Sequence, residues 1–342
     1  MAFDFLVPVE DKVLAHCELL PVQSIGKNTH IHTVKDGLPV LANATVAILG
    51  VKESRNAFEK KLEKLDVSAI RIQFYKLLLG NWNGTIVDLG DIEEGESVED
   101  TYFVVKEIVA GLLEENVIPI ILGATQDITY PAYRAFDGIK DMIKLVAIDS
   151  RFDFGIDDEL ISSHSYMSKI ITDKPNNLFN FSNLGYQSYF NAQEEVDLME
   201  RLFFDAYRLG EIANDLSLAE PALRNAHMVS LDTRSIRASD ISVSANFSPN
   251  GFTGREICAI ARYAGISDKV SVFGIYEMEN NVQSQQLIAQ IMWYFIEGIT
   301  YRITESPYTK TDDFTKYNVP TCLLYTSPSP RDEQFHLVCR LL

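Results

Sequence analysis

Two aspartates and an arginine stand at alternate positions after one apolar run of the sequence. Residues 145–148 are four apolar residues in succession, and Asp149, Arg151 and Asp153 follow them. A short apolar run of this kind predicts a buried strand of a parallel sheet. Open α/β sheets gather ligands and chemistry at the carboxyl ends of such strands. Two acids at this spacing are typical of a metal or general-base site, but the arginine between them adds a permanent positive charge.

Three further predicted strand ends carry unusual polar residues, at 123–127, 232–234 and 276–277. Because the carboxyl ends of parallel strands meet at one edge of a sheet, we expect these segments to converge with residues 149–153. Each residue alone has an ordinary explanation, since an Asp after a strand is commonly a helix N-cap or turn residue. The recurrence of acids and arginines on several strand ends favours a shared site.

The elements that must position these residues alternate along the chain. Apolar runs predict strands at 45–50, 85–90, 117–123, 145–148, 178–184, 226–232 and 269–276. Helical periodicity predicts helices at 68–79, 97–116, 194–207, 253–264 and 283–297. Strands separated by helices predict an α/β fold, a three-layer α/β/α sandwich with a mostly parallel sheet.

We expect one α/β domain at 44–318, with an N-terminal extension at 1–43 packed on its core. An irregular tail follows at 319–342, where residues 327–330 read Ser-Pro-Ser-Pro. Two prolines in this spacing do not fit inside a helix or a central strand. The change in composition leaves two interpretations open, a flexible C-terminus or a segment foreign to the gene.

The composition bounds the partners and the compartment. The chain has 342 residues, of which 46% are hydrophobic, and its 48 Asp+Glu against 30 Lys+Arg give a formal charge of -18. This acidic excess argues against nucleic acid and anionic membranes as partners. We find no signal peptide and no apolar run of the roughly 20 residues that span a bilayer. Cys17, Cys258, Cys322 and Cys339 form no CxxC pair, so we expect free thiols and a cytoplasmic protein.

The order of these segments resembles the ureohydrolase superfamily, which includes arginase, agmatinase and formimidoylglutamase. The resemblance covers roughly residues 45–300 and is strongest to a divergent formimidoylglutamase-like branch. The family segments Gly-Gly-Asp-His, Asp-Ala-His-Ala-Asp and Ser-Phe-Asp-Val-Asp match residues 123–126, 149–153 and 230–234. The most literal match is Asn-Gly-Phe-Thr-Gly-Arg-Glu at 250–256, against Gly-Gly-Leu-Thr-x-Arg-Glu in the family.

The resemblance implies a site and a reaction. Members of the family hold two manganese ions with two His and four Asp, and a hydroxide bridging the metals attacks the guanidinium or imino carbon. The corresponding positions here are Gln126, Asp149, Arg151, Asp153, Asp232 and Arg234. By the same resemblance, Glu277 matches the glutamate that binds the cationic end of the substrate, and His164 matches a histidine proposed to shuttle a proton.

Half of the ligand positions depart from the family pattern. Arginine offers no lone pair and stays protonated, so Arg151 and Arg234 remove the second metal site, and Gln126 offers the first only a weak amide oxygen. We expect the two arginines to form a salt-bridge cluster with the aspartates and to hold them ionised. We therefore expect no cofactor, or at most one divalent metal, manganese by resemblance. The single-metal ligands would be Asp149, Asp153 and Asp232.

Two functions of different class follow. One is hydrolysis of a C–N bond in a small amidine or guanidine, most like the hydrolysis of formimidoylglutamate, with His164 and Glu277 as catalytic residues. The other is a non-catalytic relative that keeps the fold and serves as a binding or assembly protein. The resemblance favours the first and the chemistry of the ligand positions favours the second. The family also implies a homo-oligomer.

Overall fold

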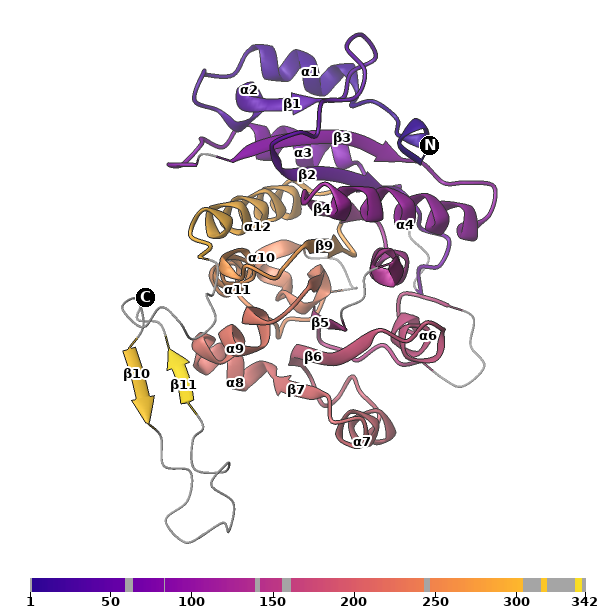
Figure 1. Ribbon diagram of the computed structural model, residues 1–342, viewed down its shortest axis with the longest axis vertical. Coiled ribbons are helices and arrows are strands. Elements are labelled where there is room, and N and C mark those ends of the chain that lie inside the picture. The colour runs from indigo at the N-terminus through magenta and orange to yellow at the C-terminus, as the bar shows by residue number, and fades with distance from the viewer. Residues whose placement is uncertain are drawn as a thin grey trace, which may run out of the picture. The chain divides into compact units, whose positions relative to one another are not determined.

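The chain forms two compact units, Met1–Arg302 and Ile303–Leu342. The computed structural model describes residues 2–58, 64–82, 84–138, 142–155, 161–242, 247–303, 315–318 and 336–339. The first unit holds a nine-stranded sheet whose strand pairings are all parallel. The predicted α/β fold is therefore confirmed (Figure 1).

The strands lie in the order β1-β3-β2-β4-β9-β8-β5-β6-β7. Their bounds in that order are Thr29–Ile31, Thr85–Ile92, Ala44–Val51, Ile118–Gly123, Val272–Tyr276, Met228–Asp232, Ile143–Ile148, Leu178–Tyr186 and Asp205–Arg208. The strands β4, β9, β8 and β5 are neighbours at the centre of the sheet, although they are distant in sequence. This order brings together the four strand ends that carry the polar residues.

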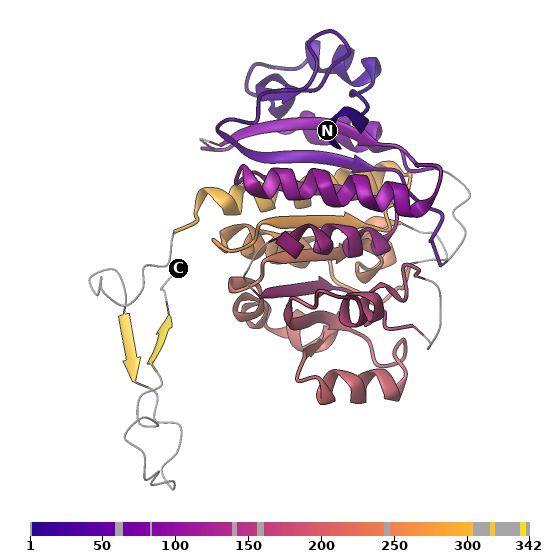
Figure 2. The same cartoon turned by 45° about the vertical axis from the view of Figure 1, so that its right-hand side comes forward.

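Each face of the sheet is covered by helices, because successive side chains of a strand point to opposite faces. Along β2, Val46 and Ile48 belong to one core, while Ala47 and Leu49 belong to the other. The first core packs on α3 (Val67–Tyr75), α11 (Gly254–Ile266) and α12 (Val282–Thr300). The second packs on α4 (Val98–Glu114), α5 (Thr129–Arg134) and α6 (Tyr166–Thr172). The result is the three-layer sandwich, with helices on both sides of the sheet (Figure 2).

The remaining helical segments are short and lie in the connections. They are α1 (Asp11–Glu18), α2 (Ile25–Asn28), α7 (Gln193–Arg201), α8 (Leu209–Asn214), α9 (Ala219–Arg224), α10 (Ala238–Ile241) and 3₁₀ turns at Ala2–Phe5, Gln126–Ile128, Ala135–Gly138, Leu216–Leu218 and Thr233–Ser235. Among the described residues no helix is long and apolar enough to cross a bilayer.

One predicted helix is shorter in the structure, and two short strands were not predicted. The helix predicted at 194–207 ends with α7 at Arg201, and Phe203 has a positive φ of 56° that breaks the helical path. The chain then forms β7, which pairs with β6. The N-terminal extension, which was expected to pack on the core, supplies the short strand β1, which pairs with β3.

The second unit contains an antiparallel strand pair, β10 (Thr315–Asn318) and β11 (His336–Cys339). Strand β11 is the described part of the tail 319–342, which was expected to be irregular. The Ser-Pro-Ser-Pro run and Cys322 lie outside the described residues. In the first unit Cys17 and Cys258 are buried free thiols, as expected.

Candidate functional site

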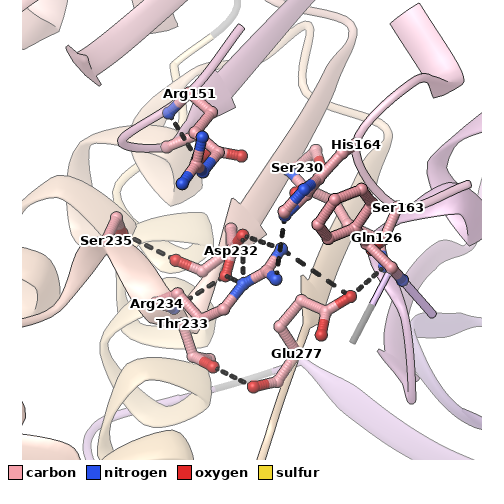
Figure 3. Close-up of polar contacts among 12 residues, drawn as sticks. Gln126, Arg151, Ser163, His164, Ser230, Asp232, Thr233, Arg234, Ser235 and Glu277 are labelled. Atoms are coloured by element: carbon pink, nitrogen blue, oxygen red, sulfur yellow. Dashed lines mark hydrogen bonds and ion pairs between the residues drawn. The ribbon is translucent and has the colours of Figure 1, made fainter. Parts of the chain in front are cut away.

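The polar strand ends converge at the carboxyl edge of β4, β9, β8 and β5. Asp149, Asp153 and Asp232 are 1%, 3% and 2% exposed, and Gln126 and Glu277 are also buried. Burying a charge is costly unless it is paired, so the partners of these groups decide the chemistry of the site. Figure 3 shows that Arg234 lies between Asp232, His164 and Glu277.

The central contact is an ion pair between Arg234 and Asp232. Arg234 Nη2 lies 2.7 Å from Asp232 Oδ2, and Nε lies 2.9 Å from the same oxygen and 3.2 Å from Oδ1. The pair is set up locally, because Asp232 caps a 3₁₀ turn and its Oδ1 accepts the backbone N–H of Arg234 at 2.7 Å. Both carboxylate oxygens of Asp232 are therefore engaged by one residue. This ion pair agrees with the salt-bridge cluster expected at the ligand positions.

The same guanidinium also reaches His164 and Glu277. Arg234 Nη1 lies 3.1 Å from His164 Nε2, and Nη2 lies 3.9 Å from Glu277 Oε1. Because a guanidinium only donates, His164 Nε2 accepts this hydrogen bond and the ring is neutral. Burial, and then the charges of Arg234 and Arg151, lower the pKa of His164 to about 3. In this arrangement His164 is an acceptor for Arg234, and its ring stacks on Phe58 at 4.2 Å between ring centroids.

Arg151 lies away from the aspartates. Its Nη1 donates to the Phe190 carbonyl oxygen at 2.8 Å, and its guanidinium carbon lies 4.7 Å from the centre of the Phe190 ring. Within the described residues it forms no ion pair with the three aspartates, so only one of the two arginines enters the expected cluster. Its contact with Asp149 is made by the backbone N–H, which donates to Asp149 Oδ1 at 2.8 Å.

Among the described residues, no cationic side chain forms an ion pair with Asp149 or Asp153. Burial and the charge of Asp232 raise the pKa of Asp149 to about 7, and burial and Asp149 raise the pKa of Asp153 well above its usual value. Burial also raises the pKa of Asp232, more than Arg234 lowers it. The pKa values of all three aspartates are therefore raised, whereas arginines that held them ionised would lower these values.

Gln126 is held by Glu277, which follows β9, and by Tyr166 of α6. Its backbone N–H donates to Glu277 Oε1 at 3.0 Å, and its Nε2 donates to the Tyr166 hydroxyl at 3.1 Å. Glu277 itself has a positive φ of 60°, a conformation that turns it out of β9 toward this contact. Gln126 Oε1 has no hydrogen-bond partner among the described groups, and the same is true of Asp149 Oδ2 and both carboxylate oxygens of Asp153.

The residues present do not fit a binuclear metal centre. Arg234 and Arg151 supply no lone pair, and the guanidinium of Arg234 occupies the carboxylate of Asp232. In the part of the chain that the structure describes, no three His, Cys, Asp or Glu side chains are grouped so that they could hold a metal ion. The unpartnered oxygens of Asp149, Asp153 and Gln126 are hard donors that suit a divalent cation in type, though not in this grouping.

Two residues near the site were not predicted. Tyr102 donates its hydroxyl to Asp127, and burial raises the pKa of Asp127 to about 6. Tyr166, which contacts Gln126, is fully buried. Asp127 belongs to the polar strand end at 123–127 that the sequence indicated, but Tyr102 and Tyr166 lie in helices whose orientation the sequence does not fix.

Comparison with known proteins gives one family and several solved structures of similar fold. The model of the Arginase family matches residues 44–297. No curated protein sequence matches the chain at a significant level. A structure of Trypanosoma cruzi formiminoglutamase with Mn²⁺ is similar at 16% identity with a TM-score of 0.69, over 76% of this chain and 95% of that one.

Two further structures are similar at comparable levels. Formimidoylglutamase from Bacillus subtilis has 14% identity and a TM-score of 0.65, over 76% of this chain and 88% of that one. Agmatine ureohydrolase from Thermoplasma volcanium has 17% identity and a TM-score of 0.65, over 85% of this chain and 98% of that one. At these identities the likeness concerns the fold.

Proposed function

The chain belongs to the arginase family, and we propose that it is a non-catalytic member in which an arginine–aspartate ion pair replaces the binuclear manganese centre. The observation that carries the proposal is the position of Arg234, whose guanidinium engages both carboxylate oxygens of Asp232 and reaches His164 at 3.1 Å. A permanent cation at a metal-ligand position opposes binding of a divalent ion on the same carboxylate, because like charges in a buried site repel strongly.

The role that remains for such a protein is binding or assembly. The family resemblance supports a homo-oligomer and a small amidine or guanidine as the ligand class to screen first, and the absence of a CxxC pair supports a cytoplasmic location. The step that we propose the chain lacks is metal-assisted activation of water, since Arg234 occupies both carboxylate oxygens of Asp232 and His164 accepts a hydrogen bond from Arg234. A general base must have a free lone pair within reach of the proton that it removes.

The test is metal content by mass spectrometry, after purification with manganese and dialysis. We expect no manganese to remain bound. Two equivalents per chain would overturn the proposal and restore the hydrolase function, with hydrolysis of formimidoylglutamate as the first activity to assay.

A second candidate is a hydrolase with a single divalent metal. Gln126 Oε1, Asp149 Oδ2 and the two Asp153 oxygens are buried without partners among the described groups, and such oxygens favour a cation. About one equivalent in the same measurement, lost in the D149N variant, would support this candidate over the first.

Restoring the family ligands tests whether the chain lacks metal only because these ligands are missing or because the rest of the pocket has changed as well. We expect the triple variant Gln126→His, Arg151→His, Arg234→Asp to bind manganese, because every position then offers a lone pair. The matched control keeps Arg234 and changes only Gln126 and Arg151. It should remain without metal, because the guanidinium still occupies Asp232.

A further inference from the structure

The guanidinium of Arg234 is surrounded by hydrogen-bond acceptors. Asp232 contributes both carboxylate oxygens, His164 contributes Nε2 at 3.1 Å, and Glu277 contributes Oε1 at 3.9 Å. The side chain of Arg234 is only 12% exposed. Such a ring of acceptors is suited to bind a planar cation that has donors along its edges.

The surroundings stay acidic beyond the ion pair. Asp149, Asp153, Asp232 and Glu277 are four buried acids, and Arg234 is the cation that contacts this group in the described part of the chain. The unpartnered oxygens of Asp149 and Asp153 show that the site has more acceptors than Arg234 can satisfy.

The guanidinium belongs to a residue whose backbone is fixed by the site itself. Its N–H is bound by Asp232 Oδ1, and the neighbouring Thr233 hydroxyl donates to the Glu277 carbonyl oxygen at 2.7 Å. The backbone of Arg234 thus lies at the edge of the acidic site, and its guanidinium lies between Asp232 and Glu277, as Figure 3 shows.

We infer that Arg234 is an internal ligand, which fills a binding site for planar cations and closes it to guanidinium or amidinium groups from solution. The inference rests on the proposed function in taking Arg234 as the occupant of the altered centre. The inference adds that, when the Arg234 side chain is removed, the site still binds planar cations in preference to other cations.

The experiment is chemical rescue of the Arg234→Ala variant. The probes are guanidinium and acetamidinium chloride at up to about 20 mM, far below the concentrations at which guanidinium unfolds proteins. We expect the variant to have a lowered Tm, which either probe raises by about 3–5 °C at saturation. Sodium and ammonium chloride at the same concentrations should have no such effect, because they lack the planar fork of donors.

Two variants serve as controls. Arg237→Ala removes a nearby arginine that pairs with Asp240 at 2.7 Å but is 42% exposed, and neither probe should stabilise it. Asp232→Asn combined with Arg234→Ala removes the main acceptor and should weaken rescue at least tenfold. Equal stabilisation of Arg234→Ala and Arg237→Ala would overturn the inference.

The native chain gives a measurement that does not depend on the folding of a variant. In equilibrium dialysis with labelled guanidinium, we expect the native chain to show no saturable binding at concentrations up to about 20 mM, the highest concentration used for rescue. Saturable binding would show that Arg234 does not close the site. These outcomes are independent of the manganese content, so the inference can fail while the proposed function stands, and the reverse.

Discussion

The contacts of Asp232 and Arg234 make each residue depend on the other. Removing one partner of a buried ion pair leaves a buried charge uncompensated, which costs more than the pair contributes when intact. For Asp232→Asn, the nearest remaining carboxylate oxygen to the guanidinium of Arg234 is Glu277 Oε1 at 3.9 Å. We expect a loss of about 3–5 kcal/mol in the free energy of unfolding, measured by urea denaturation.

Arg237→Ala is again the matched comparison, because it breaks an ion pair of similar length on an exposed part of the same segment. Its loss should be about 1 kcal/mol or less, since solvent screens exposed pairs. Equal losses in the two variants would mean that burial does not determine the strength of the Asp232–Arg234 pair.

Asp149 makes the stability of the fold depend on pH. Its pKa is raised to about 7 in the folded chain, above the value near 3.9 of an unfolded aspartate. Between these values the folded state binds more protons than the unfolded state, so stability is greatest at low pH and falls as the pH rises through 7. We expect the native chain to lose on the order of 3 kcal/mol more than Asp149→Asn between pH 5 and pH 8. Parallel stability curves for the two proteins would contradict this assignment.

The sequence located the site residues but not the direction of their side chains. Gln126, Asp149, Asp153, Asp232, Arg234 and Glu277 do converge, because each follows a strand of one parallel sheet. Arg151 follows the same rule of position, yet its side chain packs on Phe190. Phe190 is 39 residues away along the chain, so no local pattern near Arg151 could have indicated this contact.

At the scale of elements, buried strands were predicted well and edge strands were not. β4, β5 and β8 lie inside the sheet as apolar runs, which the sequence shows directly. β1 and β7 are edge strands of three and four residues, with polar side chains, and their pairing to β3 and β6 is what makes them strands. Because that pairing depends on the rest of the fold, it leaves little trace in the local sequence.

The helices α11 and α12 cross at a pair of glycines. A Cβ added at Gly298 would lie 2.4 Å from the Arg262 carbonyl oxygen, and one at Gly265 would lie 2.1 Å from the Phe295 carbonyl oxygen. Since neither helix can move without opening the core beneath it, we expect Gly298→Ala to cost about 2 kcal/mol or more in the free energy of unfolding.

Gly210, in α8, is the matched control for this substitution. A Cβ there meets no described atom within 4 Å, so Gly210→Ala should stabilise the chain by about 0.5 kcal/mol through the lower entropy of the unfolded state. A neutral Gly298→Ala variant would show that the two helices can separate at their crossing without cost.

At the scale of the whole molecule, the first unit contains both hydrophobic cores and ends at Arg302. Arg302 Nε donates to the Gly265 carbonyl oxygen and Nη2 to the Val270 carbonyl oxygen, each at 2.8 Å. These two bonds fasten the end of the unit to the C-terminus of α11 and to the segment that leads into β9. Arg302 is therefore the last residue that we expect the sheet domain to need.

A chain truncated after Arg302 tests where the folding unit ends. We expect it to keep the Tm of the full chain within about 1–2 °C, because both cores and the polar site are complete. Adding Arg302→Ala to the truncated chain should lower stability by about 2–4 kcal/mol, since it leaves two carbonyl oxygens without their charged donor. If truncation alone caused a loss of that size, residues 303–342 would contribute to the stability of the sheet domain, and the boundary at Arg302 would be wrong.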